Sequence, residues 1–257
     1  MTQIASHRGG AALWPENSAT AFRETAQLDV EQIEFDVQRS ADGVPVIFHD
    51  TDLDRVTDGT GPLAARTLAE LKALTIFNGG GQILTLEEGL DLIEPTHLVP
   101  RCEIKPGPGL VPYPGLVAQT LDAFAARGMT GRTVITSFHL PTLGAALAQA
   151  DGLRDVIWLV ADPVLRLTSP RHVAHLARLE GVPSVSPRHT LLRDGTLEAL
   201  RGEGLSVGAF AVLEDEAIAW AFAAGLDVFT TDRPDAALAI RAHLQSGSPT
   251  EAHDRAQ

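Results

Sequence analysis

The residues best able to do chemistry in this chain are crowded into its first fifty positions. Two histidines, two closely spaced acidic residues and an arginine follow short apolar runs there: His7, Arg8, Glu34, Asp36 and His49. Carboxylates bind hard divalent cations, arginine binds phosphate through paired hydrogen bonds, and histidine carries protons near neutral pH. The set could therefore hold a metal ion beside a phosphate, with a proton carrier on each side. This combination indicates an enzyme.

The acidic residues suggest a metal site. Glu34 and Asp36 are two residues apart in an apolar run, so both point to the same face of a strand, and Glu103 and Lys105 repeat this spacing. Carboxylates that converge at strand ends repel one another unless a cation or a proton lies between them. Glu34, Asp36 and Glu103 are hard oxygen ligands suited to Mg²⁺ or Ca²⁺ rather than zinc. Structural salt bridges are the alternative for any one of these residues.

The histidines and basic residues complete the predicted site. His7 and His49 each end a predicted strand and could serve as a general acid–base pair. The other seven histidines fall in predicted helices, loops or the tail, and His139 and His189 are the least firmly excluded of these. Arg8 could bind phosphate, with the following glycines allowing close backbone approach. Lys105 is one of only two lysines in the chain, which indicates that a compact cation is needed at its strand end.

The segment after the first of these motifs opens a predicted helix. Ser18 is expected to be the N-cap of that helix. Asn17 is a second candidate for the cap and could additionally reach the metal site or orient its neighbours.

Short apolar runs alternate with longer amphipathic segments along the whole chain. We predict strands at residues 3–6, 32–37, 98–104, 133–136, 155–160, 184–185, 206–211 and 228–230. We predict helices at residues 18–28, 86–93, 116–126, 141–150, 171–179, 196–201 and 214–223, and capping boxes at Thr67–Glu70 and Thr85–Glu88. Alternation of eight strands with helices predicts an α/β fold, a TIM (β/α)8 barrel.

One segment departs from this alternation. The apolar run at residues 44–48 follows the second strand too closely for a helical crossover, which predicts a β-hairpin extension. A loop of even length, such as a two-residue Asp-Gly turn, would place His49 opposite Asp36 or Glu34. The same register would put Phe35, Val37, Val46 and Phe48 on the other face.

Length and charge limit the remaining possibilities. The 257 residues suffice for one barrel domain, expected at residues 1–245, with a polar and flexible tail at 246–257. A net charge of −13 disfavours nucleic acid and anionic membranes as partners, but permits a small anionic substrate. Cys102 is the only cysteine, so no intrachain disulfide can form. Without a signal peptide or a membrane-spanning run we expect a cytoplasmic protein with no stable membrane association; its oligomeric state is left open.

These motifs together resemble the glycerophosphodiester phosphodiesterases, a family of phospholipase-C-like TIM-barrel enzymes. The matching residues run in the family's order: His7-Arg8-Gly9, Pro15-Glu16-Asn17, Glu34-Phe35-Asp36-Val37, Asp42-Gly43-Val44-Pro45-Val46, His49-Asp50, Glu103-Ile104-Lys105, Ser137-Phe138 and Thr231-Asp232-Arg233-Pro234. The late run Phe210-Ala211-Val212-Leu213 departs from the family's Trp-Thr-Val-Asn-like pattern, which places polar contacts to the substrate in doubt.

The resemblance implies metal-dependent hydrolysis of glycerophosphodiesters to glycerol 3-phosphate and an alcohol, through a cyclic phosphate. It implies that Glu34, Asp36 and Glu103 bind one Mg²⁺ or Ca²⁺ ion and that His7 and His49 exchange protons. Arg8 and Lys105 would contact the substrate phosphate.

Two other functions remain open at this point. A lysophospholipase D or sphingomyelinase-like enzyme would need an apolar surface near the barrel mouth, for which residues 108–113 are the only candidate. A barrel that binds phosphodiesters without catalysis is favoured if either histidine is lost, and both are present. An aldolase or amidohydrolase barrel lacks the expected lysine environment or His-x-His zinc pair.

Overall fold

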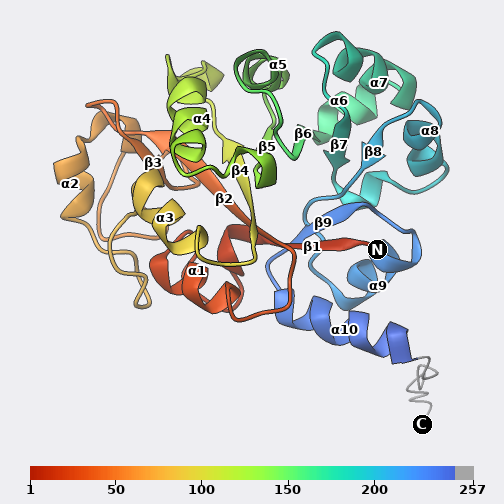
Figure 1. The fold of residues 1–257 in the computed structure, drawn as a ribbon, viewed down its shortest axis with the longest axis horizontal. Coiled ribbons are helices and arrows are strands. Elements are labelled where there is room, and N and C mark those ends of the chain that lie inside the picture. The colour runs from red at the N-terminus through yellow and green to blue at the C-terminus, as the bar shows by residue number, and fades with distance from the viewer. Residues whose placement is uncertain (247–257) are drawn as a thin grey trace.

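Eight parallel strands form the centre of the protein in a computed structural model that describes residues 1–246. Their order is β8, β7, β6, β5, β4, β2, β1 and β9, and a parallel bridge between Ala209 and Phe229 connects β8 to β9. Helices follow one another around the outside of these strands (Figure 1). The TIM-barrel prediction is confirmed, and each of the eight predicted strand segments overlaps an observed strand. The predicted tail, except Ser246, lies outside the described residues.

The elements have the following bounds. The strands are β1 (Gln3–Ser6), β2 (Gln32–Arg39), β3 (Pro45–Ile47), β4 (Val99–Ile104), β5 (Val134–Ser137), β6 (Asp155–Val160), β7 (Ser184–Pro187), β8 (Ser206–Val207) and β9 (Val228–Thr231). The helices are α1 (Ala19–Thr25), α2 (Leu68–Lys72), α3 (Leu86–Ile93), α4 (Leu116–Ala126), α5 (Leu140–Gln149), α6 (Asp162–Leu167), α7 (Pro170–Leu179), α8 (Thr196–Gly202), α9 (Asp215–Ala223) and α10 (Pro234–Ser246).

The alternation of β2 separates core from site. Phe35 packs outward against Phe22 of α1, with their ring centroids 5.6 Å apart, within the main hydrophobic core. Glu34 and Asp36 take the opposite face, toward the barrel interior. In the parallel register with β4, Asp36 lies beside Glu103 and Glu34 lies beside Arg101. The pairing of two strands therefore brings the acidic residues together.

The predicted helix caps are confirmed. Thr67 and Thr85 form capping boxes with Glu70 and Glu88, which satisfy backbone N–H groups that the first helical turn leaves free. Ser18 caps α1, where its hydroxyl accepts a hydrogen bond from the Ala21 N–H at 3.1 Å.

The predicted hairpin is present, but the predicted register is wrong. β3 runs antiparallel to β2 with Val37 opposite Ile47, so the loop of residues 40–44 has an odd length. Continued to its end, this register places His49 opposite Phe35 and Phe48 opposite Asp36. Val46 and Phe48 accordingly pack in a cluster separate from the one that contains Phe35 and Val37.

The loop is longer than the predicted Asp-Gly turn because Ser40 organises a wider one. Its N–H donates to the Val44 carbonyl, and its hydroxyl oxygen accepts from the Val44 N–H at 2.9 Å. Gly43 adopts a φ of 91°, which a glycine tolerates without strain.

Residues 48–84 form a small lobe beside the barrel after β3. Its apolar side chains form a separate buried cluster with Val46 of β3: Phe48, Leu53, Leu63, Leu71, Ile76 and Ile83. The lobe therefore holds together by its own packing. Among residues 1–246, none of the helices has the length and apolar character needed to cross a membrane.

Candidate active site

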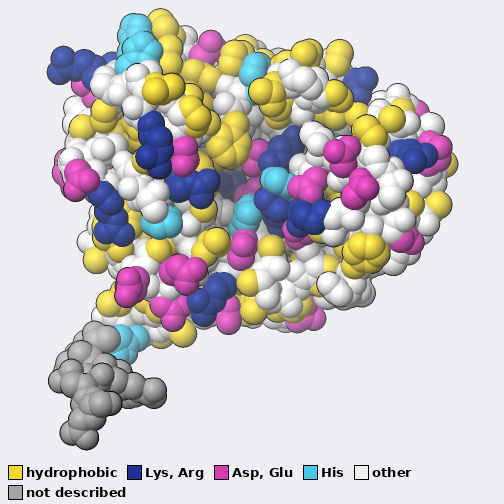
Figure 2. All heavy atoms as spheres, turned by 180° about the vertical axis from the view of Figure 1, so that it is seen from behind, with side chains coloured by type: hydrophobic (Ala, Val, Ile, Leu, Met, Phe, Trp, Pro, Cys, Tyr) yellow, Lys and Arg dark blue, Asp and Glu magenta, His cyan; other side chains and the backbone are white. Residues whose placement is uncertain are grey.

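A pocket of about 240 Å³ opens at the carboxyl ends of the barrel strands. Most of the predicted site residues line it: His7, Arg8, Glu34, His49, Glu103 and Lys105. The face of the molecule opposite to the view of Figure 1 is hollowed near its centre, where histidine, basic and acidic side chains gather (Figure 2). The active sites of TIM barrels form at this end of the strands.

Glu34, Asp36 and Glu103 converge on one point. Each offers a carboxylate oxygen within 4.8 Å of the others, and all three residues are buried. The Lys105 ammonium lies 3.0 Å from Asp36 Oδ1 and 2.7 Å from Glu103 Oε1. A divalent cation prefers such clustered hard oxygen atoms. The three residues predicted as metal ligands could therefore hold one metal ion.

Electrostatics also favour a cation at the carboxylate cluster. Burial and the adjacent charge of Asp36 raise the pKa of Glu34 to about 7. Burial acts in the same direction on Asp36, but the charges of Lys105, His49 and Arg8 outweigh it and hold the pKa of Asp36 well below its usual value. Without a cation, the cluster thus tends to keep a proton on Glu34.

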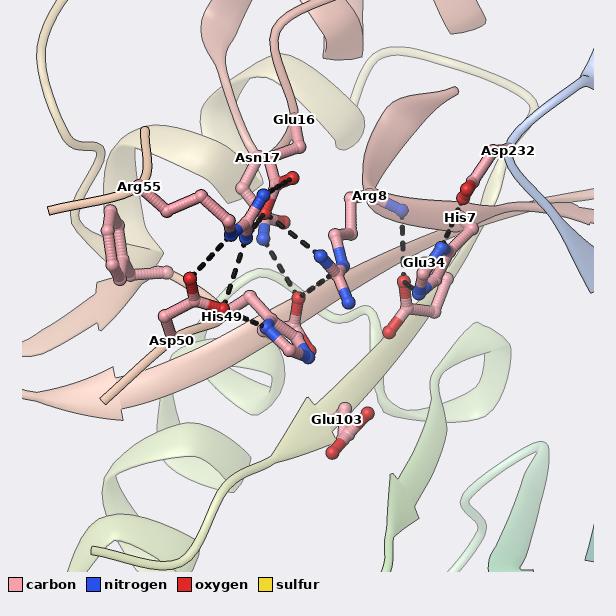
Figure 3. Close-up of polar contacts among 12 residues, drawn as sticks. His7, Arg8, Glu16, Asn17, Glu34, His49, Asp50, Arg55, Glu103 and Asp232 are labelled. Carbon is pink, nitrogen blue, oxygen red and sulfur yellow. Dashed lines mark hydrogen bonds and ion pairs between the residues drawn. The ribbon is translucent and has the colours of Figure 1, made fainter. Parts of the chain in front are cut away.

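The pairing of strands β1 and β9 places His7 next to Asp232. His7 follows β1 and Asp232 follows β9, and these strands pair with Ser6 beside Thr231. His7 Nδ1 donates a hydrogen bond to Asp232 Oδ1, which leaves Nε2 directed toward Glu34 at 3.9 Å (Figure 3). Burial lowers the pKa of His7, but the hydrogen bond to Asp232 and the charge of Glu34 outweigh this effect, so its pKa is raised.

His49 lies beyond the end of β3 and reaches the pocket through a bend in the chain. The Gln38 side-chain amide lies 3.0 Å from the Phe48 and His49 carbonyl oxygens and 2.6 Å from that of Asp50, which anchors the bend. His49 Nδ1 donates to Asp50 Oδ1 at 2.6 Å, so the two histidines are oriented in the same manner. Burial lowers the pKa of His49.

Arg55 connects the two halves of the site. Its guanidinium donates to Asp50 Oδ2 at 2.6 Å and to both Glu16 oxygens at 2.7 Å (Figure 3). Glu16 in turn accepts a hydrogen bond from Arg8 Nη1 at 3.0 Å. Arg55 therefore ties the lobe that carries His49 to the residues that position Arg8.

Arg8 and Asn17 both contact the carboxylate cluster. The Arg8 N–H donates to Glu34 Oε2 at 3.0 Å, and Arg8 Nε lies 3.5 Å from Asp36 Oδ2. The Asn17 side-chain amide donates to Asp36 Oδ2 at 2.8 Å. Asn17 therefore reaches the carboxylate cluster, which was one of its predicted roles. Gly9 permits the segment after His7 to pack closely on α1, because an added Cβ would lie 2.7 Å from the Ala21 Cβ.

Several residues of the site were assigned no role from the sequence. Asp232 was detectable, because it follows a barrel strand as His7 does. Arg101 was also detectable, because it precedes Glu103 by two residues; it is only 1% exposed and lines the pocket. Arg55 gave no signal, because its contacts depend on how the lobe folds. His139 and His189 do not line the pocket.

Fold and site together define a TIM-barrel protein with an acidic metal-type cluster flanked by two carboxylate-bound histidines. The family model for "Glycerophosphoryl diester phosphodiesterase family" matches residues 7–236. A glycerophosphodiester phosphodiesterase of Caldanaerobacter subterraneus is 31% identical over 240 residues, covering 91% of this chain and 95% of that protein. The chain belongs to the glycerophosphoryl diester phosphodiesterase family and is an enzyme, a phosphoric diester hydrolase.

Solved structures agree with this family. A structure from Agrobacterium tumefaciens described as a glycerophosphoryl diester phosphodiesterase has a TM-score of 0.91 and 35% identity, and the match covers 96% of this chain and 99% of that one. A phosphodiesterase from Oleispira antarctica, solved with its product sn-glycerol 3-phosphate, has a TM-score of 0.83 and 24% identity, covering 94% of this chain and 97% of that one. The second likeness concerns the fold.

Proposed function

We propose that the protein hydrolyses glycerophosphodiesters to glycerol 3-phosphate and an alcohol. The observation that carries this proposal is one pocket in which His7 and His49 flank a cluster of three carboxylates, with Arg8 and Lys105 beside them. The family and the product bound to the Oleispira antarctica relative support a small phosphodiester substrate.

Glu34, Asp36 and Glu103 would hold one divalent ion, Mg²⁺ or Ca²⁺. When bound there, such an ion supplies positive charge that polarises phosphoryl oxygen atoms. The convergence of the three buried carboxylates and the raised pKa of Glu34 support a cation at this position.

The two histidines would act as the acid–base pair. In the first step one neutral imidazole takes the proton of the glycerol 2-hydroxyl as its oxygen attacks phosphorus, and the other, protonated, gives its proton to the departing alcohol oxygen. A cyclic glycerophosphate results. Water then opens the ring with the proton-transfer roles exchanged, which gives glycerol 3-phosphate and restores both histidines.

The basic residues would stabilise the charge that develops on phosphate. Lys105 and Arg8 present an ammonium and a guanidinium to the same pocket, where burial strengthens their attraction for oxyanions. Asp232 and Asp50 hold Nδ1 of each histidine, so both Nε2 atoms remain available for proton transfer.

Measuring glycerol 3-phosphate release from glycerophosphoethanolamine tests the proposal. We expect turnover that a chelator abolishes and added Mg²⁺ or Ca²⁺ restores. His7→Ala and His49→Ala should each reduce kcat about 10²–10⁴-fold, the usual contribution of an acid–base group. Phosphorus NMR should detect the cyclic phosphate before the final product. Full activity in either variant would contradict the acid–base assignment, and binding without turnover would indicate a non-catalytic barrel.

One observation favours a second candidate, a lysophospholipase D or sphingomyelinase-like activity. Leu110 and Val111 are 76% and 64% exposed, and Leu110 lines a cavity that also contains His49 and Lys105. An acyl chain could lie against such a surface. Comparing glycerophosphocholine with its monoacyl counterpart decides the question, because faster cleavage of the acylated diester would favour this alternative.

We also infer that residues 1–245 act as one catalytic domain. Its main core cluster contains side chains from both ends of the described chain, including Ile4 of β1 and Ala237 of α10. Limited proteolysis that released a stable folded fragment would contradict this inference.

A further inference from the structure

The wall of the pocket away from the carboxylate cluster differs in character from the cluster. It is lined by aromatic and aliphatic side chains from the ends of three strands, β5, β6 and β8: Phe138, Leu159, Phe210, Ala211 and Leu213. Phe138 and Phe210 meet edge to face, with ring centroids 5.5 Å apart. Arg188 follows β7, between the ends of β6 and β8, and lines the pocket together with these residues. A substrate group that lies against them therefore meets an apolar surface and the guanidinium of Arg188.

Arg188 is held in place from two sides. Its Nε lies 3.1 and 3.0 Å from the two carboxylate oxygens of Asp162, and its guanidinium carbon lies 5.2 Å from the centre of the Phe210 ring. A parallel backbone bridge also joins Arg188 to Phe210. These contacts restrain the side chain at the pocket wall.

The terminal nitrogens of Arg188 remain available for a ligand. Nη1 and Nη2 make no hydrogen bond within residues 1–246, because Asp162 contacts only the Nε side. A guanidinium binds a carboxylate or phosphate through such paired N–H groups. A restrained arginine with free terminal donors is a preformed site for an oxyanion.

The same wall lacks the groups that recognise a quaternary ammonium. The acidic residues of the pocket are already engaged: Asp232 with His7, Glu103 with Lys105, and Glu34 with the Arg8 backbone N–H. Arg188 covers the Phe210 ring, which would otherwise attract a cation. A choline group would therefore meet like charge and no acidic partner.

We propose that Arg188 selects glycerophosphodiesters whose alcohol carries an oxyanion, such as the carboxylate of a serine head group. The proposal rests on the proposed hydrolase function and concerns the alcohol side of the substrate. Arg188 lines the same cavity as His49, Arg8 and Lys105. One small diester can therefore contact Arg188 with its alcohol group and the other three residues with its phosphate.

The sharpest test compares two diesters that differ only in the carboxylate, glycerophosphoserine and glycerophosphoethanolamine. We expect the wild-type enzyme to have about a tenfold higher kcat/KM for the serine diester, from a charge-assisted hydrogen bond. Arg188→Gln should remove this preference by lowering the serine value about tenfold, with the ethanolamine value changed less than twofold. Arg188→Lys, which keeps the charge, should retain part of the preference.

Arg193→Gln is the matched control. Arg193 follows Arg188 by five residues, but its guanidinium stacks on Trp220 at 3.8 Å and does not line the pocket. The ratio of the two kcat/KM values should stay at the wild-type level in this variant.

The possible outcomes are distinct. Equal wild-type rates with the two diesters would overturn the proposal, and so would an equal loss on both in Arg188→Gln, since Arg188 would then contact the shared glycerol phosphate. Absence of turnover with either diester and metal present would overturn the proposed function, and this proposal with it. Loss confined to glycerophosphoserine supports it.

Discussion

At the scale of single residues, the site depends on opposite charges held close together out of water. The pairing of Nδ1 with an aspartate recurs at both histidines, although Asp232 lies far from His7 in sequence and Asp50 directly follows His49. Such a pairing sets the tautomer and orientation of an imidazole. Position at the end of a predicted strand singled out the two histidines as candidates, but only Asp50 is a sequence neighbour of its histidine.

Replacing the partner of His7 should change its titration. Asp232 raises the pKa of His7 through a hydrogen bond and its charge. Asp232→Asn removes the charge and weakens the bond to the imidazolium, so the pKa of His7 should fall. In a profile of kcat/KM against pH, the limb that reports His7 should move to lower pH. An unchanged profile would show that His7 does not titrate in catalysis.

Lys105 should have opposing effects on metal binding and on catalysis. Its ammonium lies near Asp36 and Glu103 and competes with a cation for their charge. In Lys105→Met, calorimetry should therefore show tighter binding of Mg²⁺ or Ca²⁺. The same variant should lose about 10²–10³-fold in kcat, because a donor to the phosphoryl oxygens is gone. Weaker metal binding would contradict this role.

At the scale of elements, strand register and the added lobe create the site. The parallel pairing of β2 with β4 sets Asp36 beside Glu103. The hairpin that precedes the lobe has a register opposite in parity to the predicted one, yet His49 reaches the pocket because Gln38 anchors the bend after β3. The local pattern of Asp42-Gly43 did not reveal the wider turn that Ser40 organises.

Arg55 provides a test of the contact between lobe and barrel. Arg55→Gln removes the ion pairs with Glu16 and Asp50, so Arg8 and His49 lose their common support. We expect kcat/KM to fall about tenfold. The free energy of unfolding should change by only about 0.2–1 kcal/mol, since Arg55 is about half exposed.

Arg66→Gln is the control for this variant. Arg66 belongs to the same lobe but pairs with exposed Glu70 at 3.9 Å and does not line the pocket. Its activity should match the wild type. Equal activities of the two variants would show that the Arg55 contacts do not position the site.

At the scale of the whole molecule, the two ends of the barrel have separate tasks. The proposed catalytic groups gather at the carboxyl ends of the strands, and the opposite end of the barrel joins the first and last elements. There Arg241 of α10 donates to Glu31 Oε1 at 2.5 Å and to the Asp29 carbonyl, and Glu31 Oε2 accepts from the Ile4 N–H at 2.8 Å. These contacts therefore hold the fold together at the end of the barrel away from the candidate active site.

Breaking that connection should affect stability alone. Arg241→Met removes a largely buried guanidinium and leaves the partly exposed Glu31 carboxylate without its ionic partner. We expect the free energy of unfolding to fall by about 1.5–3 kcal/mol, the usual contribution of hydrogen bonds to charged groups. Denaturant titration measures this loss, while kcat/KM at 25 °C should be unchanged. A large loss of activity in the folded variant would contradict the separation of the two ends.

The sequence by itself determined the barrel, because eight apolar runs that alternate with amphipathic segments have few other ways to bury their surface. It also singled out Glu34, Asp36, Glu103, His7 and His49 as candidate site residues, because alternation along a strand and position at its end limit where a side chain points. Tertiary structure decided which groups meet across the pocket: Asp232 with His7, Arg55 with Glu16 and Asp50, and Arg188 with Phe210. These contacts join segments distant in sequence, so they depend on packing and loop geometry that local patterns do not encode.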